Sequence, residues 1–577
     1  MKTGSRILLE LLRDHGVDVI FGYPGGAVIQ LYDELTRFPE IRHILVRHEQ
    51  AAAHAADGYA RATGRPGVCL ATSGPGATNL VTGLACAYFD SVPLIAITGQ
   101  VATPQLGRDS FQEVDIVGIT RSCTKHNYLV RSLRELPNVV QEAFMVATTG
   151  RPGPVLIDIP RDVLASQARD ASRGKSLSHK RPSRRLGHPL QVRRAAEAIA
   201  RAQRPILCSG AGVINSGAHA PLQRLAEWMQ LPVVTTFLGL GSFPSDHPLS
   251  LGMLGMHGTY GANMAVTNAD LLLVVGCRLD DRATGNPEGF APKAKIVHID
   301  IDPSSIGKTV RAHIPIVGDA GEVLKQILEC LGDLGAEVPP TRQEWLQRVW
   351  KWKGYGPDET EPKEVIRPQQ VIKELSQLTS AETIISTDVG QHQMWTALHY
   401  SFKIPRTLLS SGGLGAMGYG LPAAIGAQVA FPLREVVCIS GDGSFQMNMQ
   451  ELGTLISYDL PLKIVVLNNG SLGMVRQWQS LLFEGRYSET IFERGPDLQK
   501  LAQAYGIKSF RALSPDEVVP CLTKGLGEKG PVIMEFLVDP EEKVYPMVLP
   551  GRKLDEMIMG KEGQSPSCTK AKVSGRS

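Results

Sequence analysis

Two short apolar runs, separated by one helix length, constrain the fold of this chain more than any other feature. The first, at 436–440, leads into Gly441-Asp442-Gly443, and the second, at 462–467, leads into Asn468-Asn469. The stretch between them has helix length and apolar residues near one face, namely Phe445, Met449, Leu452 and Ile456. A strand, a helix and a strand in this order form a crossover with parallel strands. We therefore expect Asp442 and Asn469 to emerge at one carboxyl edge of a sheet, where open α/β sheets bind ligands.

The residues at this edge suit a metal ion and a diphosphate. One carboxylate, one amide oxygen and a nearby backbone carbonyl match the preferences of Mg²⁺, with a diphosphate completing the octahedron. An ordinary crossover with a tight glycine turn explains Gly441-Asp442-Gly443 at least as well when that motif is taken alone. The Asn pair one crossover later favours the metal–diphosphate site instead. This spacing is typical of a site for thiamine diphosphate.

Composition narrows the class of protein. The 577 residues predict three or four domains of about 150 residues each. A formal net charge of +3 gives no indication of nucleic-acid or membrane binding. The nine cysteines contain no Cys-x-x-Cys pair and indicate reduced intracellular thiols. The sequence has no signal peptide and no apolar run of membrane-spanning length, so we expect a cytoplasmic protein.

Short apolar runs alternate with helical stretches in three blocks separated by polar linkers. The expected strands lie at 17–21, 41–46, 68–71, 94–98, 155–159, 206–210, 271–276, 296–301 and 383–387, besides the two named above. This alternation predicts an α/β fold with three doubly wound parallel-sheet domains. We expect these domains at 1–167, 191–335 and 367–547, with linkers at 168–190 and 352–366 and a C-terminal tail at 548–577 that is disordered from 565.

Thiamine chemistry requires a second half of the site. The aminopyrimidine of the cofactor activates the reacting carbon when a carboxyl group binds its ring nitrogen. Glu49 fits this role, because it follows one expected strand and precedes an Ala-rich helix at 51–62. Taken alone, a Glu at such a junction indicates only a favourable charge at a helix N-terminus.

Three further motifs decide between these readings of Glu49. They are Phe21-Gly22-Tyr23-Pro24-Gly25-Gly26-Ala27, Arg47-His48-Glu49-Gln50 and Thr72-Ser73-Gly74-Pro75-Gly76. They resemble the pyrimidine-binding domain of thiamine-dependent 2-keto acid enzymes. More narrowly, the chain from about residue 5 to about 558 is similar to the catalytic (large) subunits of the acetolactate synthases, also called acetohydroxyacid synthases. The resemblance implies that Glu49 is the cofactor-activating acid and that the three domains bind the pyrimidine, a flavin and the diphosphate.

The same resemblance implies the remaining site residues. The contacts to thiamine diphosphate would be Glu49, Gln391, His392, Met417, Gly441, Gly443, Ser444 and Ser471, and the Mg²⁺ ligands Asp442, Asn469 and Ser471. The catalytic groups would be Glu49, Gln112 and Gly26, and the substrate contacts Phe111, Arg282, Met474 and Trp478. Read in isolation, Met474 and Trp478 share a helix face and are more typical of a core.

The middle block resembles the FAD-contacting segments of the acetolactate synthases. These segments are 209–212, 254–258, 276–282, 298–303 and 317–319. The implied flavin contacts are Arg151, His257, Gly258, Arg278, Asp300 and Asp319. An Arg suits a diphosphate or a ring edge, and an acid at a strand end suits a ribose hydroxyl. His257 alone is more often a structural histidine, and a glycine turn alone explains the first segment.

The implied activity is decarboxylation of pyruvate followed by ligation of the hydroxyethyl unit to a second 2-keto acid. With pyruvate as acceptor the product is 2-acetolactate, and with 2-ketobutyrate it is 2-aceto-2-hydroxybutyrate. In this family the site forms across a dimer, and many catalytic chains bind a small regulatory subunit. We therefore expect a homodimer or homotetramer. A flavin-using pyruvate oxidase and a non-catalytic paralogue stay as alternatives, although intact Glu49, Asp442 and Asn469 argue against the second.

The chain departs from many of these relatives along the expected substrate channel. It has Ala102 where they have Pro, Ser110 where they have Ala, and Arg161 where they have Lys. These changes bear on inhibitor sensitivity rather than on the reaction.

Overall fold

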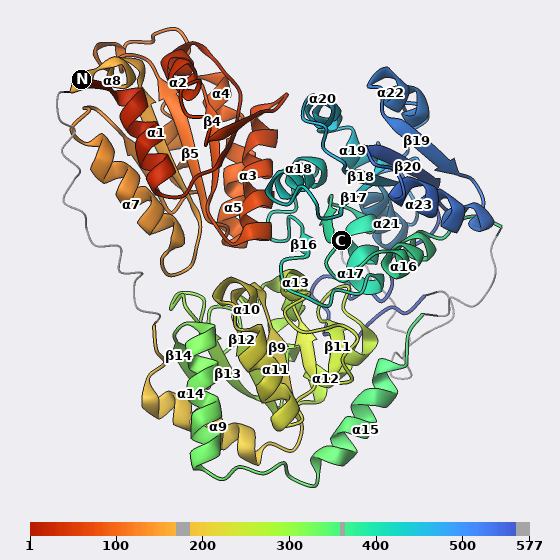
Figure 1. Cartoon of the computed structure of the whole chain (residues 1–577). Coiled ribbons are helices and arrows are strands. Elements are labelled where there is room, and N and C mark those ends of the chain that lie inside the picture. The colour runs from red at the N-terminus through yellow and green to blue at the C-terminus, as the bar shows by residue number, and fades with distance from the viewer. Residues whose placement is uncertain (169–184, 358–363, 561–577) are drawn as a thin grey trace, which may run out of the picture. The chain divides into compact units, whose positions relative to one another are not determined.

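Three six-stranded parallel sheets form the framework of the protein (Figure 1). The computed structural model describes residues 1–168, 185–357 and 364–560. The described residues form two compact units. One unit contains the first and third sheets, and the other contains the central sheet, helix α16 (Pro368–Leu378) and residues 541–560. The predicted α/β class with three parallel-sheet domains is confirmed.

The first sheet has the strand order β3-β2-β4-β5-β7-β6. Its strands are β2 (Val19–Gly22), β3 (Arg42–Leu45), β4 (Gly67–Ala71), β5 (Leu94–Gln100), β6 (His126–Leu129) and β7 (Pro154–Pro160). The principal helices are α1 (Gly4–Asp14), α2 (Ile29–Leu35), α3 (Glu49–Thr63), α4 (Pro75–Thr78), α5 (Val81–Asp90) and α7 (Leu136–Thr148). The inner strands β4, β5 and β7 are buried along their whole length. They therefore have continuous apolar runs, as expected of strands covered on both faces.

The central sheet has the strand order β11-β10-β9-β12-β13-β14. The strands are β9 (Pro205–Ser209), β10 (Val233–Thr235), β11 (Ser250–Met253), β12 (Leu271–Val275), β13 (Lys295–Asp300) and β14 (Ile314–Val317). The helices include α9 (Pro189–Arg201), α10 (Ala211–Ser216), α11 (His219–Trp228), α12 (Tyr260–Asn268), α13 (Asp281–Thr284), α14 (Ala320–Asp333) and α15 (Arg342–Lys353). This order runs outward in both directions from β9, as in dinucleotide-binding sheets, and places the topological switch point between β9 and β12.

The third sheet has the order β16-β15-β17-β18-β20-β19, which repeats the winding of the first. Its strands are β15 (Ile384–Thr387), β16 (Leu408–Leu409), β17 (Val436–Gly441), β18 (Lys463–Asn468), β19 (Lys508–Ala512) and β20 (Val532–Leu537). The helices are α17 (Gln391–His399), α18 (Gly420–Ala430), α19 (Asp442–Phe445), α20 (Leu452–Ser457), α21 (Gly473–Leu482), α22 (Leu498–Ala504) and α23 (Val518–Leu526).

Helices α3 and α18 join the first and third domains within one unit. Their backbones almost touch, because a Cβ on Gly58 would lie 2.1 Å from the carbonyl oxygen of Ala423. A Cβ on Gly426 would lie 1.9 Å from the carbonyl oxygen of Ala55. Only small residues at these crossings permit such an approach, which explains why α3 is rich in alanine. The contact fixes the helix that begins with Glu49 against the third domain.

The predicted helix at 444–458 is wrong as a single element. The segment forms α19, a 3₁₀ turn at Met449–Glu451 and then α20. The break falls at Asn448, whose backbone is not helical (φ −135°, ψ 25°) and whose side-chain amide donates to the carbonyl of Gly418 at 2.6 Å. Phe445 and Leu452 are buried as expected, but Ile456 is 40% exposed. A tertiary hydrogen bond therefore overrides the helical pattern here.

Most of the first predicted linker, residues 169–184, and the predicted disordered end, 565–577, lie outside the described residues. Residues 358–363 of the second predicted linker lie outside them as well. Part of the predicted tail is well packed: Val548, Leu554 and Met557 are buried in an apolar cluster with strands and helices of the central domain.

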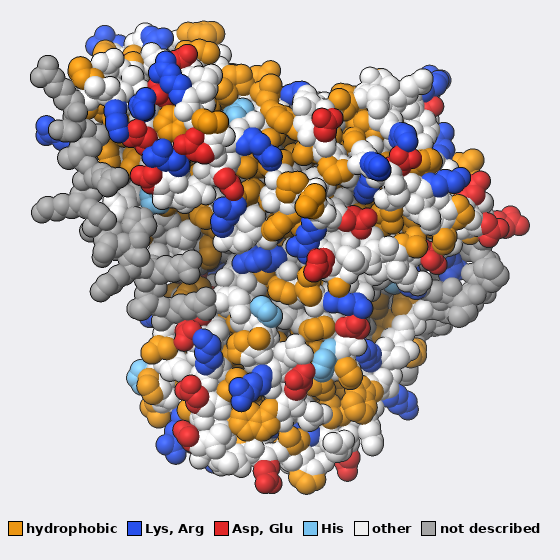
Figure 2. Space-filling model, viewed as in Figure 1, with side chains coloured by type: hydrophobic (Ala, Val, Ile, Leu, Met, Phe, Trp, Pro, Cys, Tyr) orange, Lys and Arg blue, Asp and Glu red, His pale blue; other side chains and the backbone are white. Residues whose placement is uncertain are grey.

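The visible surface carries basic and acidic side chains interspersed (Figure 2). Within the described ranges no helix is both long and apolar enough to cross a membrane.

Candidate active site

The carboxyl edge of the third sheet brings the two opening motifs together. Strands β17 and β18 pair in parallel, with Gly441 opposite Leu467, so the predicted pairing is confirmed. The next residues leave the sheet side by side, and the backbone N–H of Asn469 donates to Oδ1 of Asp442 at 3.4 Å. Burial raises the pKa of Asp442 to about 6, while hydrogen bonds from backbone N–H groups oppose this shift.

The donor set at this edge fits a hard cation. The side-chain oxygen of Asn469 accepts the N–H of Ser471 at 3.1 Å. The Ser471 hydroxyl oxygen is buried and has no hydrogen-bond partner among the described residues. No group of three or more His, Cys, Asp or Glu side chains suitable for a metal occurs in the described part of the chain. A metal at Asp442 would therefore depend on one carboxylate, neutral oxygens and the oxygens of a diphosphate, a set that Mg²⁺ accepts.

A second segment, at the start of α17, closes around the same place. Nδ2 of Asn469 donates to Oε1 of Gln391 at 3.2 Å, and Nε2 of Gln391 donates to Gln477 at 2.8 Å. A Cβ on Gly441 would lie 2.9 Å from Nδ1 of His392, so only glycine fits there. Burial lowers the pKa of His392 to about 3, which keeps its ring neutral. The Ser444 hydroxyl donates to the carbonyl of Val389 at 2.8 Å.

The predicted cofactor contacts of the third domain thus come together from three elements. Gln391 and His392 begin α17, Gly443 and Ser444 lie in α19, and Ser471 precedes α21. A Cβ on Gly443 would lie 2.9 Å from the Leu472 side chain. Glycine is therefore needed here for packing.

Met417 lies in the loop 411–418, which precedes α18 and is held at its end by Asp388. The N–H of Gly418 donates to Oδ1 of Asp388 at 2.7 Å, and the carbonyl of Gly418 accepts from Asn448. Gly415 and Gly418 have positive φ of 69° and 85°, a conformation that favours glycine. Burial raises the pKa of Asp388 to about 6. Asp388 and Asn448 are absent from the predicted site, although an Asp directly after a strand is a signal that sequence reasoning can use.

Glu49 is the first residue of α3, at the carboxyl edge of the first sheet. Its Oε2 accepts from Nδ2 of Asn79 at 2.9 Å. A Cβ on Gly76 would lie 3.3 Å from Oε1 of Glu49 and 2.8 Å from the methyl carbon of Thr72. The Thr72 hydroxyl also accepts the N–H of Ala27 at 3.2 Å. The three motifs that carry the resemblance in this domain therefore meet around Glu49, and Thr72 and Asn79 join the predicted set.

Gly26 and Gln112 also belong to this neighbourhood. Gly26 has open space where a side chain would stand. Gln112 has a positive φ of 60°, and a Cβ on Gly74 would lie 2.9 Å from the Cβ of Gln112. The structure therefore connects Glu49, Gly26 and Gln112 through the segment 72–76.

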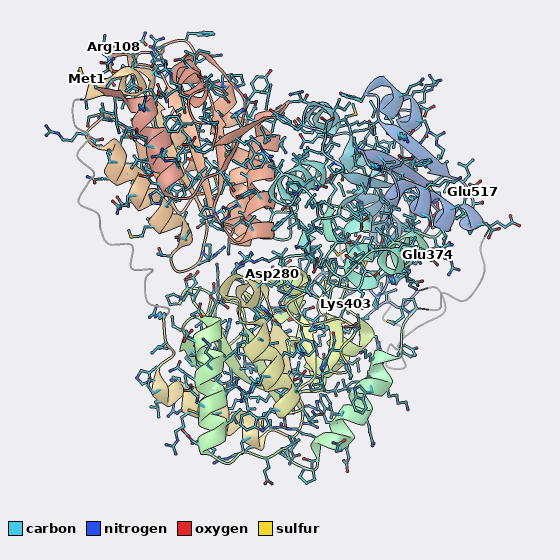
Figure 3. The ribbon with its side chains drawn as sticks, viewed as in Figure 1. Met1, Arg108, Asp280, Glu374, Lys403 and Glu517 are labelled. Atoms are coloured by element: carbon cyan, nitrogen blue, oxygen red, sulfur yellow. The ribbon has the colours of Figure 1, made fainter. Side chains whose placement is uncertain are left out.

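The loop that carries Phe111 is shaped by Glu113. The carboxylate of Glu113 accepts backbone N–H groups from Gly107, Arg108 and Ser110. Arg108 is labelled in Figure 3. Phe111, 87% exposed, projects from this loop into solvent. Two of the departures from the family meet nearby, because Ser110 and Arg161 both donate to Gln105.

Met474 and Trp478 lie one turn apart on α21. Both side chains are only partly buried. Neither side chain is therefore fully enclosed in a core, and their role as substrate contacts stays a prediction.

The switch point of the central sheet has the properties of a ligand site. A Cβ on Gly212 would lie 2.6 Å from the Cα of Gly276, so the turns after β9 and β12 approach at backbone distance. Burial lowers the pKa of His257 to about 4, and its Nδ1 has no hydrogen-bond partner among the described residues. The buried hydroxyl of Thr235, at the end of β10, also lacks a partner in the described part of the chain. Thr235 was not predicted, and its sequence context gives no signal.

The other predicted flavin residues have varied environments. Asp300 ends β13, and its Oδ1 accepts the N–H of Asp302 at 2.8 Å. Asp319 caps α14 through the N–H groups of Gly321 and Glu322. Arg278 is partly buried, and Gly258 is tightly packed, with 2.6 Å between its Cβ position and the N atom of Gly255.

Two predicted arginines lie in different units. Arg282 is exposed in the central domain, 3.8 Å from the carboxylate of Asp281, and donates to the sulfur of Met256. Arg151 belongs to the first unit, where its guanidinium donates to Ser91 at 2.8 Å and to the carbonyl of Tyr88 at 3.0 Å. In its own unit, Arg151 therefore fixes the end of α5.

Comparisons with known proteins agree with this arrangement. Three family models of thiamine pyrophosphate enzymes match the chain: the N-terminal TPP binding domain at 2–119, the central domain at 192–327 and the C-terminal TPP binding domain at 388–536. The chain is 49% identical to a probable acetolactate synthase large subunit of Methanocaldococcus jannaschii, over 96% of this chain and 95% of the relative. It is 46% identical to the acetolactate synthase isozyme 3 large subunit of Escherichia coli (strain K12), over 97% and 99%. It is 48% identical to an acetolactate synthase of Arthrospira platensis, over 96% and 97%.

Proposed function

Because the chain belongs to the acetolactate synthase large subunits, a family of thiamine pyrophosphate enzymes, we propose that it decarboxylates pyruvate and ligates the hydroxyethyl unit to a second 2-keto acid. The acceptor is pyruvate or 2-ketobutyrate. This reaction is the first common step in the synthesis of the branched-chain amino acids.

The observation that carries the proposal is the arrangement at the carboxyl edge of the third sheet. Asp442, Asn469 and the buried, unpartnered hydroxyl of Ser471 supply the oxygens for Mg²⁺. Gln391 and His392, with the close glycine Gly441, form the wall against which a diphosphate would lie. Because His392 is neutral, it would contribute hydrogen bonding rather than positive charge at this wall.

Thiamine diphosphate, when bound, supplies the electron sink for decarboxylation and carbon–carbon bond formation. The residues of the chain orient it and exclude water. Glu49, oriented by Asn79, would bind the ring nitrogen of the aminopyrimidine. Met417 would support the cofactor from the loop 411–418, while Gln112, Phe111, Met474 and Trp478 would face the substrates. Arg282 would neutralise the carboxylate of the acceptor.

The central domain fits FAD. Its switch point combines close glycines with two buried polar atoms without partners in the described residues, Nδ1 of His257 and the hydroxyl of Thr235. The net reaction transfers no electrons, so the flavin would have a structural role. His257, Gly258, Arg278, Asp300, Asp319 and Arg151 would contact it.

The assembly follows from the family. We propose a homodimer or homotetramer in which Glu49 of one subunit serves the diphosphate site of another. The relatives named large subunits point to a small regulatory subunit as a further partner.

The test is anaerobic incubation of the purified chain with pyruvate, thiamine diphosphate, Mg²⁺ and FAD. Formation of 2-acetolactate without reduction of any electron acceptor supports the synthase. Added 2-ketobutyrate should divert product to 2-aceto-2-hydroxybutyrate. Acetate or acetyl phosphate formed only with an electron acceptor would overturn the proposal in favour of a pyruvate oxidase.

A further inference from the structure

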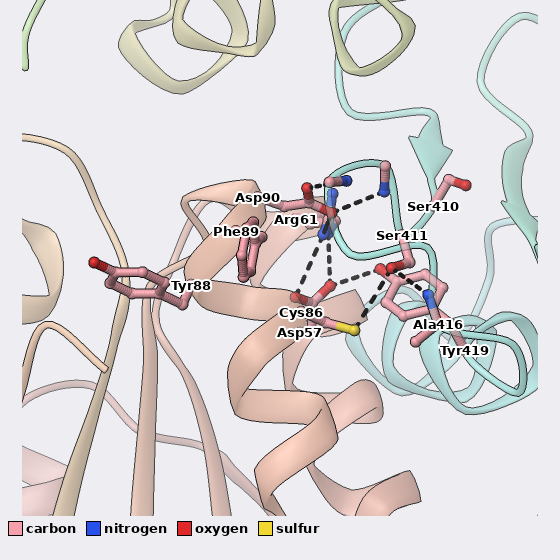
Figure 4. A network of polar contacts seen from close by, with 12 residues as sticks. Asp57, Arg61, Cys86, Tyr88, Phe89, Asp90, Ser410, Ser411, Ala416 and Tyr419 are labelled. Carbon is pink, nitrogen blue, oxygen red and sulfur yellow. Dashed lines mark hydrogen bonds and ion pairs between the residues drawn. The ribbon is translucent and has the colours of Figure 1, made fainter. Parts of the chain in front are cut away.

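A buried polar network joins α3, α5 and the loop 411–418 within the first unit (Figure 4). Arg61 lies one turn after Asp57 on α3, with its Nε 2.6 Å from Oδ1 of Asp57. The same guanidinium reaches Oδ2 of Asp90, the last residue of α5, at 2.7 Å. Both carboxylates have no exposed side-chain surface. The cluster therefore places two buried carboxyl groups around one guanidinium.

Two backbone amides of the loop donate hydrogen bonds to the carboxylate of Asp90. Oδ2 of Asp90 accepts the N–H of Gly412 at 3.0 Å, and Oδ1 accepts the N–H of Gly413 at 2.7 Å. Hydrogen bonds to a carboxylate are shorter and about twice as strong as those between neutral groups. Because Arg61 holds Oδ2, the carboxylate presents both oxygens to the loop in one fixed orientation.

Further bonds hold the rest of the loop. The hydroxyl oxygen of Ser411 accepts the N–H of Ala416 at 3.1 Å and lies 3.5 Å from the sulfur of Cys86. Tyr419, just after the loop, donates its hydroxyl hydrogen to Asp57 at 2.6 Å. The loop is thus fixed at its start by Asp90 of the first domain and at its end by Asp388 of the third. Gly415, Ala416 and Met417 lie between these anchors.

We propose that Asp90 is a positioning residue for catalysis: by holding the amides of Gly412 and Gly413 it sets the position of Met417 under the bound cofactor. The inference rests on the proposed function, since it gives Met417 the role of a cofactor support. Arg61, itself paired with Asp57, orients Asp90. If the role of Asp90 were only structural, Asp90 would tie α5 to the third domain, and a change in the geometry of the loop would not affect the reaction.

The first test measures the loop directly. In Asp90→Asn the side chain retains one acceptor oxygen, so at least one of the two glycine amides or Arg61 loses its partner. Hydrogen exchange of the full chain, loaded with thiamine diphosphate and Mg²⁺, should show faster exchange at Gly412 and Gly413 by at least about tenfold. Unchanged exchange at both amides would overturn the proposal.

The second test measures catalysis on the same variant. We expect kcat for acetolactate to fall by about 100-fold, because small misplacements of groups around a reacting centre have effects of this size. The KM for pyruvate should stay unchanged, since Asp90 touches no substrate, and the near-ultraviolet circular dichroism of the bound cofactor should change. Faster exchange with wild-type kcat and an unaltered cofactor spectrum would show a structural role only and overturn the proposal.

Two further variants control for folding. Asp18→Asn is a control for the loss of a carboxylate that binds an Arg: Asp18 pairs with Tyr59 of α3 at 2.6 Å and with Arg65, just after α3, at 2.9 Å, but is not in the loop network. It should leave kcat and the cofactor spectrum as in the wild type. Ser411→Ala removes the acceptor of Ala416 without disturbing a buried charge, and should reduce kcat in the same way but less. If Asp90→Asn does not fold, normal kcat and a normal spectrum in Ser411→Ala would overturn the proposal.

Failure of the proposed function gives a different result. If the wild type binds thiamine diphosphate but makes no acetolactate, the proposed synthase activity is contradicted. Hydrogen exchange and the cofactor spectrum of Asp90→Asn then still test whether Asp90 positions the loop.

Discussion

Two carboxyl groups, those of Glu49 and Asp158, have contrasting surroundings in this molecule. Glu49 stands at the start of α3 beside Asn79 and Gly76 and is partly exposed. Asp158, on β7, is 1% exposed and receives hydrogen bonds from Thr98 at 2.7 Å and Gln100 at 3.0 Å. We propose a role in the reaction for the first only, because the second is enclosed.

Glu49→Gln tests the activating acid. The amide cannot supply the proton-transfer function of the carboxyl group, so acetolactate formation should fall by at least about 100-fold. Steady-state assays with saturating cofactor measure this, with Glu10→Gln, a change at a partly exposed position of α1, as control. Full activity in Glu49→Gln would show that another group activates the cofactor.

Asp158 predicts a pH dependence of stability. Burial raises the pKa of Asp158 to about 7 from 3.8, and the neighbouring charge of Asp115 adds to this shift. Between these values the folded chain holds a proton that the unfolded chain releases, so this group lowers the free energy of unfolding as pH rises from about 4 to about 7. Asp158→Asn removes the titration.

The free energy of unfolding of Asp158→Asn, relative to the wild type, should therefore rise by about 2 to 3 kcal/mol between pH 5 and pH 8. Urea unfolding at both pH values measures it. A constant offset from altered hydrogen bonds with Gln100 does not affect this slope. An equal difference at both pH values would contradict a raised pKa.

A site residue could be predicted from the sequence when it lies in a contiguous motif, and could not when its role depends on partners elsewhere in the chain. Asp442, Asn469 and Glu49 stand in contiguous motifs beside strand ends, so sequence alone identifies them as candidates. Asp90 and Asp388 bind backbone amides that are distant from them in sequence. Their roles appear only once the fold brings those partners near, because a carboxylate carries no mark of its future neighbour.

At the scale of elements, the closest packing is between α3 and α18. Gly426→Ala would place a methyl group 1.9 Å from the carbonyl oxygen of Ala55, and backbone cannot yield as a flexible side chain does. We expect the free energy of unfolding to fall by about 1 to 3 kcal/mol or more. Chemical denaturation measures it.

Gly332→Ala is the matched control for this prediction. Gly332 lies near the end of α14 and has nothing within 4 Å of its Cβ position. The same change should there be neutral or stabilise by up to about 1 kcal/mol, through helix propensity. Equal effects at the two sites would show that α3 and α18 do not pack closely in solution.

Sequence patterns predicted the interior strands except β10 and β20, and among the edge strands they predicted only β3. β4, β5, β12 and β17 are continuous apolar runs, because both faces are covered. β6 (His126–Leu129) and β19 (Lys508–Ala512) are edge strands with polar residues and were missed. Short strands such as β10 and β16 offer too few residues for any periodicity.

At the scale of the whole molecule, the proposed dimer makes a prediction about mixed subunits. Glu49→Gln and Asp442→Asn should each inactivate a homodimer. If each site combines Glu49 of one chain with Asp442 of the other, a mixed dimer contains one intact site. Random reassortment of equal amounts should then restore about a quarter of the wild-type activity.

Refolding or co-expressing the two variants together, followed by acetolactate assay, measures this restoration. The double variant mixed with wild type serves as control for subunit exchange. No restoration, with exchange demonstrated, would place both halves of the site in one chain.

The winding shared by the first and third sheets has a consequence for synthesis of the chain. In both sheets the strand that comes last in sequence occupies an interior position: β7 lies between β5 and β6, and β20 lies between β18 and β19. A nascent chain that ends before such a strand cannot close its sheet and exposes unpaired backbone on two strands at once. Arrested or truncated translation products are therefore the species most prone to aggregate, and demand for chaperones should peak just before β7 and β20 leave the ribosome.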